Sequence, residues 1–336
     1  MFASRRYFAF SACCLVSMFG WCSLIMADDA KFRWADGPQP GVSDLLLGDK
    51  PVVRYMALPY DRSTKEKEHD TYKVFHHVFA PDGKTIVTKG PGGQYTHHRG
   101  LYVAWNKTNY EGKTDDFWHC TKGAHQAHVT FTNQTADEHQ GTAVSVIHWN
   151  DAEGKPVIVE NRSIGVSRSP EGTTGWQINW RTVLASQRGE IKLDGDRQHA
   201  GFQFRAAQVV SEKASARFIR PDGFPQQADA VQVGDAGDPP SHSNIPWVAM
   251  TYEVEGQKVT VAYFEDPSLP KPSLFSERPY GRFGAFWKTT LAADKPLMMR
   301  YRLLVTFGEP PARDTIQKWF GQFVEDLKKY SSGKQE

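Results

Sequence analysis

Most of this chain repeats one pattern, in which short runs of alternating apolar and polar residues are separated by brief turns. In the run 176–184, the tryptophans, isoleucine and leucine fall on one face, and the amides and arginine fall on the other. Successive side chains of a strand point to opposite faces, so this period of two predicts a half-buried strand. The segment 151–154, Asp-Ala-Glu-Gly, is typical of the tight turn that joins two antiparallel strands.

The same pattern recurs along the sequence with almost no helical periodicity between the runs. Predicted strands cover 52–57, 72–79, 101–105, 127–132, 142–149, 157–166, 176–184, 202–209, 248–254, 259–264 and 298–307. Short turns between strands favour antiparallel pairing and argue against a parallel sheet with crossover helices. We therefore predict an all-β fold, a large antiparallel β-sandwich, formed by a single domain over 28–336.

One clear helix is predicted, at the C-terminal end over 312–329. Pro310 and Pro311 precede it, and Asp314 lies near its start, where the helix dipole favours a negative charge. Its large apolar residues recur at helical spacing on one side, at Ile316, Trp319, Phe320, Phe323, Val324 and Leu327. We expect this face to dock on the sandwich.

The first 27 residues have the features of an export signal. Arg5 and Arg6 form a basic start, and 12–26 is an apolar run that is short for a membrane span. Ala27 is a small residue at which cleavage fits. The arginine pair also resembles a twin-arginine signal, so we expect an exported protein, periplasmic or extracellular. An ordinary secretory signal, in which arginine pairs are common, is the alternative to the twin-arginine route.

The charge balance excludes some classes of partner. The sequence has 40 Lys and Arg against 38 Asp and Glu, and the surplus of two is accounted for by Arg5 and Arg6. The remainder is neutral, which favours neither nucleic acid nor an anionic membrane surface. No apolar run of about 20 residues follows the leader, so we expect no membrane span in the mature chain.

Residues 94–128 contain five of the twelve histidines, and this density predicts a site. Three imidazoles suit zinc or another borderline divalent metal with one coordination position left open. The candidate metal ligands are His97, His119, His125 and His128. Their spacing matches no standard metal motif, so histidines hydrogen-bonded in a polar cleft are the alternative, and the cofactor stays unknown.

Other side chains are suited to acid–base catalysis or to binding a sugar. Imidazoles have a pKa near neutrality, and burial can tune a glutamate, so the candidate catalytic residues are His97, His98, His128 and Glu277. Guanidiniums bind carboxylates or sugar diols, and aromatic rings stack on sugars. The candidate substrate-binding residues are Arg99, Trp105, Trp118, Arg205, Asp266, Arg278 and Tyr280. Structural ion pairing is the alternative for the arginines.

Several blocks of the sequence resemble a known family, the one labelled methane oxygenase PmoA and also filed as a domain of unknown function. The similar blocks are THHRGLYVAW at 96–105, DFW at 116–118, His128, HAGFQFRAA at 199–207, FEDPSLPKP at 264–272, ERPYGRFGAF at 277–286 and MRYRLLVTFG at 299–308. The resemblance covers 72–308 and implies a soluble β-sandwich similar to the galactose-mutarotase-like supersandwich, a fold that often handles sugars. Methane oxidation itself does not follow, because a membrane subunit needs apolar runs that this chain lacks beyond its leader.

These residues and this resemblance predict a carbohydrate-active protein that acts on or binds a sugar or uronate-like ligand, as a hydrolase, lyase or epimerase. A non-catalytic carbohydrate-binding module and a metal-dependent oxidoreductase are the alternatives. We expect His97, Arg99, His128, Arg205 and Arg278 to line one pocket on the concave face of a sheet, because each would be costly to bury without partners. Arg99→Ala would then weaken ligand binding by about 1.5–3 kcal/mol and change stability less.

The leader generates the first testable prediction. Because a basic start, an apolar run and a small residue precede Asp28, we expect the mature chain to begin near that residue. N-terminal sequencing of the protein recovered from the producing cells measures this, and an intact leader on protein in the membrane fraction would contradict it. If the twin-arginine route is used, Arg5→Lys combined with Arg6→Lys abolishes export, and normal export of that double variant excludes the route.

Overall fold

The computed structural model describes residues 30–224 and 243–331. The predicted leader, 1–27, lies outside these residues, as does the start of the predicted domain at 28. The described residues form mainly antiparallel sheets. This arrangement confirms the predicted all-β antiparallel sandwich with one long C-terminal helix.

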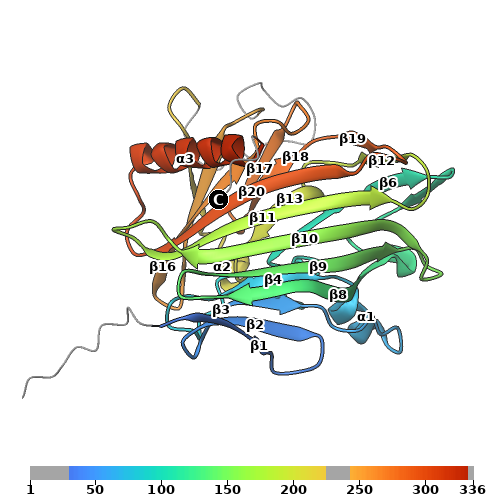
Figure 1. The fold of residues 1–336 in the computed structure, drawn as a ribbon, viewed down its shortest axis with the longest axis horizontal. Coiled ribbons are helices and arrows are strands. Elements are labelled where there is room, and N and C mark those ends of the chain that lie inside the picture. Colours follow the sequence, from blue (N-terminus) through green and yellow to red (C-terminus); the bar gives the residue numbers. More distant parts are fainter. Residues whose placement is uncertain (1–29, 225–242, 332–336) are drawn as a thin grey trace, which may run out of the picture. The chain divides into compact units, whose positions relative to one another are not determined.

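Three sheets are present in the part of the chain that the structure describes (Figure 1). In pairing order, the first sheet has β1 (Phe32–Asp36), β2 (Val42–Leu47), β3 (Lys50–Met56), β4 (Phe75–Val78), β5 (Leu101–Trp105), β13 (Ala200–Arg205), β18 (Arg282–Phe286) and β17 (Leu274–Arg278). The second has β14 (Arg217–Ile219), β15 (Trp247–Val254), β16 (Gln257–Glu265), β20 (Leu297–Phe307), β11 (Thr174–Ser186), β10 (Pro156–Arg168), β9 (Gln140–Asn150) and β8 (His125–Ala136). A smaller third sheet has β19 (Thr289–Leu291), β12 (Ile191–Asp194), β6 (Lys107–Tyr110) and β7 (Lys113–Asp115).

The main core lies between the two large sheets. Phe202 on β13 of the first sheet places its ring centroid 4.7 Å from those of Trp180 and Tyr301, which belong to β11 and β20 of the second. All three side chains are almost completely buried. Alternation along β13 therefore turns Phe202 and Phe204 toward the second sheet and Gln203 and Arg205 away from it.

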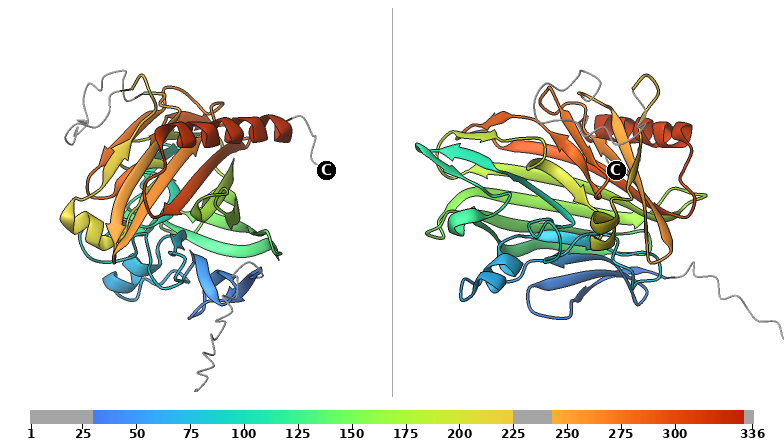
Figure 2. Two further views of the ribbon diagram at one scale, coloured as in Figure 1. Left: turned by 90° about the vertical axis from the view of Figure 1, so that its left-hand side faces the viewer. Right: turned by 180° about the vertical axis from the view of Figure 1, so that it is seen from behind.

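The helix α3 (Arg313–Ser331) covers the other face of the second sheet, near the predicted range (Figures 1 and 2). Its apolar side packs on strand residues in a second cluster, in which Phe264 lies 5.7 Å from Phe320 and 6.1 Å from Phe323 between ring centroids. This confirms the expected docking. No helix of the described ranges, 30–224 and 243–331, is long and apolar enough to cross a membrane.

Some local structure departs from the strand predictions. The predicted strand 72–79 is shorter, because α1 (Lys65–Thr71) precedes it and β4 begins at Phe75. The predicted strand 202–209 ends at Arg205, and α2 (Gln208–Lys213) follows. The helix α1 buries none of its residues and begins at a capping Thr64, so it has no apolar stripe from which its helical period could be read.

A buried ion pair ties the strands of the core together. Glu160 accepts hydrogen bonds from Arg162 Nε at 2.8 Å and Nη2 at 3.0 Å, and neither side chain is exposed. Glu160 also accepts from Trp149 Nε1 at 2.9 Å and Thr182 Oγ1 at 3.1 Å. Arg162 Nη1 donates to the carbonyl of Val74, just before β4, so the pair connects the second sheet to the first.

Neutralising one partner of this pair tests its contribution to stability. We expect Glu160→Gln to lower the free energy of unfolding by about 3–5 kcal/mol, because Arg162 is then left as an uncompensated buried charge. Glu171→Gln, in an exposed turn, is the matched control and should change stability by less than about 0.5 kcal/mol. Urea unfolding measures both, and equal stabilities for the two variants would show that the pair is not a stabilising centre.

Candidate functional site

The candidate site lies on the face of the first sheet that points away from the second. Arg282 on β18 is directly opposite Arg205 in the sheet register, and Tyr102 on β5 is opposite Gln203. Directly opposed residues share a face, so these side chains point outward with Arg205. Polar and aromatic groups thus occupy a sheet face whose reverse side forms the hydrophobic core.

Three histidines from different loops meet over this face. The ring centroids of His97 and His119 lie 4.7 Å apart, those of His119 and His199 lie 4.7 Å apart, and those of His97 and His199 lie 5.8 Å apart. One ring nitrogen from each can be chosen so that all three atoms lie within 4.8 Å of one another. This group could therefore hold a metal ion. The three side chains are partly buried.

Two of these imidazoles are fixed by a carboxylate three residues earlier in the chain. Asp116 Oδ2 lies 2.7 Å from His119 Nδ1, and Asp196 Oδ1 lies 2.9 Å from His199 Nδ1. Asp116 also accepts the main-chain N–H groups of Trp118 and His119, and Asp196 accepts that of Gln198, which fixes each carboxylate in place. A carboxylate at Nδ1 favours the tautomer with a proton on Nδ1, so Nε2 keeps its lone pair.

Buried cations fix the loops that carry the histidines. Lys73 donates to the carbonyls of His97, at 3.4 Å, and Trp118. Arg99 donates to the carbonyls of Thr96 at 2.6 Å, His98 at 2.8 Å and His69 at 2.6 Å. Arg205 donates to the carbonyls of Phe204 and Gln198, each at 3.2 Å. Each loop with a clustered histidine is therefore tied to a buried ammonium or guanidinium group.

These surroundings keep the imidazole of His97 neutral. Burial, reinforced by the Lys73 ammonium and the neighbouring histidines, lowers the pKa of His97 to about 2. Burial likewise lowers the pKa of Lys73 to about 7 and that of Arg205 to about 9. Burial raises the pKa of Asp196, but the contacts with His199, the Gln198 N–H and Asn106 together outweigh that effect and bring the pKa down to about 2. A neutral imidazole is a poor acid and a good metal ligand.

A group of aromatic rings adjoins the three histidines. The ring centroid of His98 lies 5.0 Å from that of Tyr95 and 6.0 Å from that of Tyr280, in stacked arrangements. The Arg282 guanidinium lies 5.4 Å from the centroid of the Tyr280 ring and donates to Ser276 Oγ at 2.7 Å. Tyr95 has a φ of 53°, a left-handed conformation that costs a non-glycine residue about 1–2 kcal/mol. Strained residues of this kind cluster at functional sites.

Comparison with known proteins identifies the family. The family model that matches residues 43–320 is described as a family of unknown function, DUF6807. The chain belongs to this family. The expected resemblance to the methane oxygenase PmoA family was therefore wrong, because the matching model is a different one and nothing indicates a methane oxygenase. No curated protein matches the sequence.

Solved structures similar to this DUF6807 protein include sugar-related enzymes. A mutant of heparan sulfate lyase HepC from Pedobacter heparinus is 8% identical, with 83% of this chain and 37% of the lyase chain covered, at a TM-score of 0.42. A GalM/aldose epimerase homologue from C. elegans is 9% identical, with 84% of this chain and 100% of that chain covered, at a TM-score of 0.33. This chain spans little more than a third of the lyase. TM-scores below 0.5 transfer neither an activity nor a site residue.

The structure brings several of the predicted site residues together. His97, His98 and His119 lie in the cluster with Tyr280. Arg205 lies beneath it, with its guanidinium 5.2 Å from the centroid of the buried Trp118 ring. Arg278 is opposite Arg282 in the strand register and so shares the outward face of the sheet.

Other members of the expected pocket lie elsewhere. His128 on β8 contacts Tyr55 Oη through Nδ1 at 2.9 Å, and Tyr55 in turn packs against His76 on the core side of the first sheet. The side chain of Arg99 is completely buried, and the hydrogen bonds described above direct its guanidinium to three loop carbonyls. The predicted pocket that includes His128 and Arg99 is therefore corrected. His128 lies on a strand of the second sheet and meets the core side of the first, and the Arg99 guanidinium is bonded to three loop carbonyls.

The predicted residues His125, Trp105, Glu277 and Asp266 also lie outside the cluster. His125 stacks on Tyr60, with ring centroids 3.7 Å apart. Trp105 is fully buried and donates through Nε1 to the carbonyl of Trp287. Glu277 is opposite Phe283, which packs in the core, so it points inward and accepts from Arg220 Nη2 at 2.6 Å. Asp266 accepts from Arg300 Nε at 2.8 Å in a groove beside α3.

Residues that the sequence analysis did not name as individual site candidates complete the cluster. They are Lys73, Tyr95, Asp116, Asp196, His199 and Arg282. A signal for part of the set was present, because Asp116 with His119 and Asp196 with His199 form the same Asp-x-x-His spacing in two distant segments. Nothing in the sequence marked Lys73, because its role as a loop anchor depends on burial.

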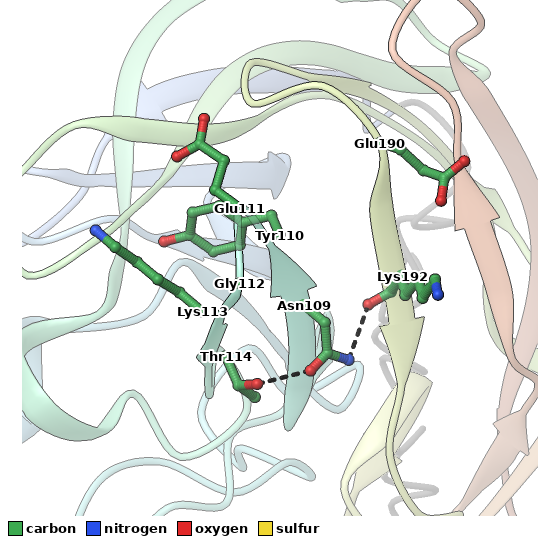
Figure 3. A pocket seen from close by; sticks show the side chains of 8 residues that line it. All are labelled: Asn109, Tyr110, Glu111, Gly112, Lys113, Thr114, Glu190 and Lys192. Atoms are coloured by element: carbon green, nitrogen blue, oxygen red, sulfur yellow. Dashed lines mark hydrogen bonds between the residues drawn. The ribbon is translucent and has the colours of Figure 1, made fainter.

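A separate groove of about 370 Å³ lies between the β6–β7 hairpin and β12 (Figure 3). Its lining is polar, and Asn109 bridges it by accepting from Thr114 Oγ1 at 2.7 Å and donating to the carbonyl of Lys192 at 3.4 Å. The groove contains none of the predicted site residues and no histidine or arginine. The histidine cluster, with its convergent titratable groups, is therefore the better candidate for a functional site.

The placement of Arg99 changes the expected effect of its removal. We predict that Arg99→Ala lowers the free energy of unfolding by about 3 kcal/mol, because hydrogen bonds from a charged donor to buried carbonyls are lost. The control is Arg33→Ala, which removes an exposed ion pair with Asp49 and should cost roughly 0–1 kcal/mol. Urea unfolding compares the two, and a small loss for Arg99→Ala would contradict its role as a loop anchor.

Proposed function

We propose that this protein is an exported carbohydrate-active enzyme that acts on an acidic sugar at the outward face of the first sheet. The observation that carries this proposal is Arg205. Its side chain is fully buried, yet among the described residues its hydrogen-bond partners are main-chain carbonyls, and its Nε has none. Burying a guanidinium without a countercharge is costly, so a carboxylate of the ligand would offset that cost.

The surroundings of Arg205 suit a uronate better than a neutral sugar. A guanidinium offers donors in a planar fork that matches a carboxylate. The neighbouring Arg282 adds positive charge, while Asp116 and Asp196 are each engaged with a histidine. The rings of Tyr95 and Tyr280, whose centroids lie 4.5 Å apart, form an aromatic group beside which a pyranose would pack.

The reaction class that fits this set is proton abstraction next to a carboxylate, as in a lyase or an epimerase. Arg205 would stabilise the negative charge that develops on the carboxylate when the neighbouring C–H bond breaks. His98 would accept the proton as a neutral but weak base, because burial lowers its pKa well below the usual value, and the Tyr280 hydroxyl would donate to a leaving oxygen. Hydrolysis fits less well, because it uses a pair of free carboxyl groups, and the predicted Glu277 and Asp266 lie outside the cluster.

Uronate polymers and their monosaccharides test this proposal. Polymers of galacturonate, glucuronate and mannuronate are incubated with the protein, and ultraviolet absorbance reports the unsaturated uronate that a lyase forms. Incorporation of solvent deuterium at the carbon beside the carboxylate reports an epimerase. Activity on at least one acidic sugar, with no activity on its neutral counterpart, is the expected result.

A variant that removes the charge of Arg205 tests whether this residue is needed for the reaction. We expect Arg205→Gln to lower kcat/KM about 100-fold or more, because it removes the group that stabilises the developing charge. Arg181→Gln, exposed on the second sheet, is the matched control and should retain full activity. A folded Arg205→Gln protein with unchanged activity would contradict the proposal. Binding of acidic sugars without turnover would replace it with a carbohydrate-binding module.

A further inference from the structure

We propose that His97, His119 and His199 bind one divalent transition-metal ion through their Nε2 atoms and leave a coordination position open. The three side chains come from loops that are far apart in the sequence, at 94–98, 116–120 and 195–199. Their convergence on one point is therefore a property of the fold and not of local chain geometry. The inference concerns the ion alone and does not require the acidic sugar.

The donor set suits a borderline ion such as Zn²⁺. Three imidazoles with a fourth position open form the ligand set of many catalytic zinc sites. In a tetrahedral site with Zn–N bonds of about 2.0–2.1 Å, the nitrogen atoms lie about 3.3 Å apart. The three ring nitrogens already lie within 4.8 Å of one another, so modest side-chain rotations are sufficient to close the site.

The two aspartates are placed where metal-bound histidines need them. A histidine ligand commonly donates its second ring N–H to a carboxylate, which fixes the ring and makes the free nitrogen more basic. Asp116 and Asp196 occupy this position for His119 and His199, with the same spacing of three residues in each case. Their two negative charges also offset the charge of the ion beside Lys73 and Arg205.

A structural role for these pairs leaves one observation unexplained. If the aspartates merely fixed their turns, the far sides of His119 and His199 would have no reason to meet a third imidazole. His97 meets them there, and its own Nε2 is buried with no hydrogen-bond partner among the described residues. A metal ion at this point would satisfy the Nε2 atom of His97.

Metal binding is tested on the full protein without any sugar. After treatment with a chelator, the protein is titrated with Zn²⁺ by calorimetry and its content is measured by mass spectrometry. We expect one ion per chain and a higher thermal unfolding temperature, because an ion that binds only the folded state stabilises it. The Co²⁺ form should show visible absorption of a four-coordinate nitrogen and oxygen site, without the charge-transfer band of a thiolate ligand.

Single substitutions test whether Zn²⁺ binds at these three histidines or elsewhere on the protein. His199→Ala should weaken Zn²⁺ binding more than 100-fold, and Asp196→Asn, which keeps the shape of the turn, should weaken it about 10–100-fold. The control His139→Ala changes a histidine that is 81% exposed and should leave the affinity unchanged. Failure of the wild-type protein to bind Zn²⁺, or equal affinity in a folded His199→Ala or Asp196→Asn variant, would overturn the proposal. A thiolate band in the Co²⁺ spectrum would overturn it as well.

Discussion

The site depends on buried cations that are bonded to main-chain carbonyls and not to carboxylates. Lys73, Arg99 and Arg205 are at most 2% exposed, and the carbonyls of the surrounding loops accept their hydrogen bonds. A buried cation is tolerated only where acceptors surround it, so the loops must fold over these three groups. The loops with His97, His119 and His199 thereby receive fixed positions although they lack regular secondary structure.

This use of carbonyls leaves the local carboxylates available for the histidines. Asp116 and Asp196 each hold one imidazole by its Nδ1 atom and do not neutralise the arginine below. Arg205 therefore keeps only main-chain carbonyls as hydrogen-bond partners among the described residues, while the two imidazoles are held in fixed orientations. A salt bridge from Arg205 to either aspartate would give the guanidinium a countercharge and would release the imidazole that this aspartate holds.

The fold could be predicted from the sequence because its signal is local. The alternation in 176–184 led to β11, and the spacing of Ile316 and Phe323 led to α3, since each period reports the side that is buried.

The site could be predicted only in part. The sequence marks 97–119 as unusual, but the register of β13 against β5 and β18 brings His199 to it, and pairing between distant strands has no local signature. Alternation did hold the information that Glu277 and Arg278 face opposite sides, and applying it to that segment would have removed Glu277 from the candidates.

The strand β13 couples the stability of the core to the geometry of the site. Phe202 and Phe204 pack against the second sheet, while Gln203 and Arg205 on the same strand face the histidines. Gln203 donates to the carbonyls of Arg197 and Ala200, which hold the turn that carries His199. A shift of β13 by one residue would exchange these two faces, burying Arg205 in the core and exposing phenylalanine. The hydrophobic core therefore specifies the register of β13, and through that register it specifies which side chains meet at the site.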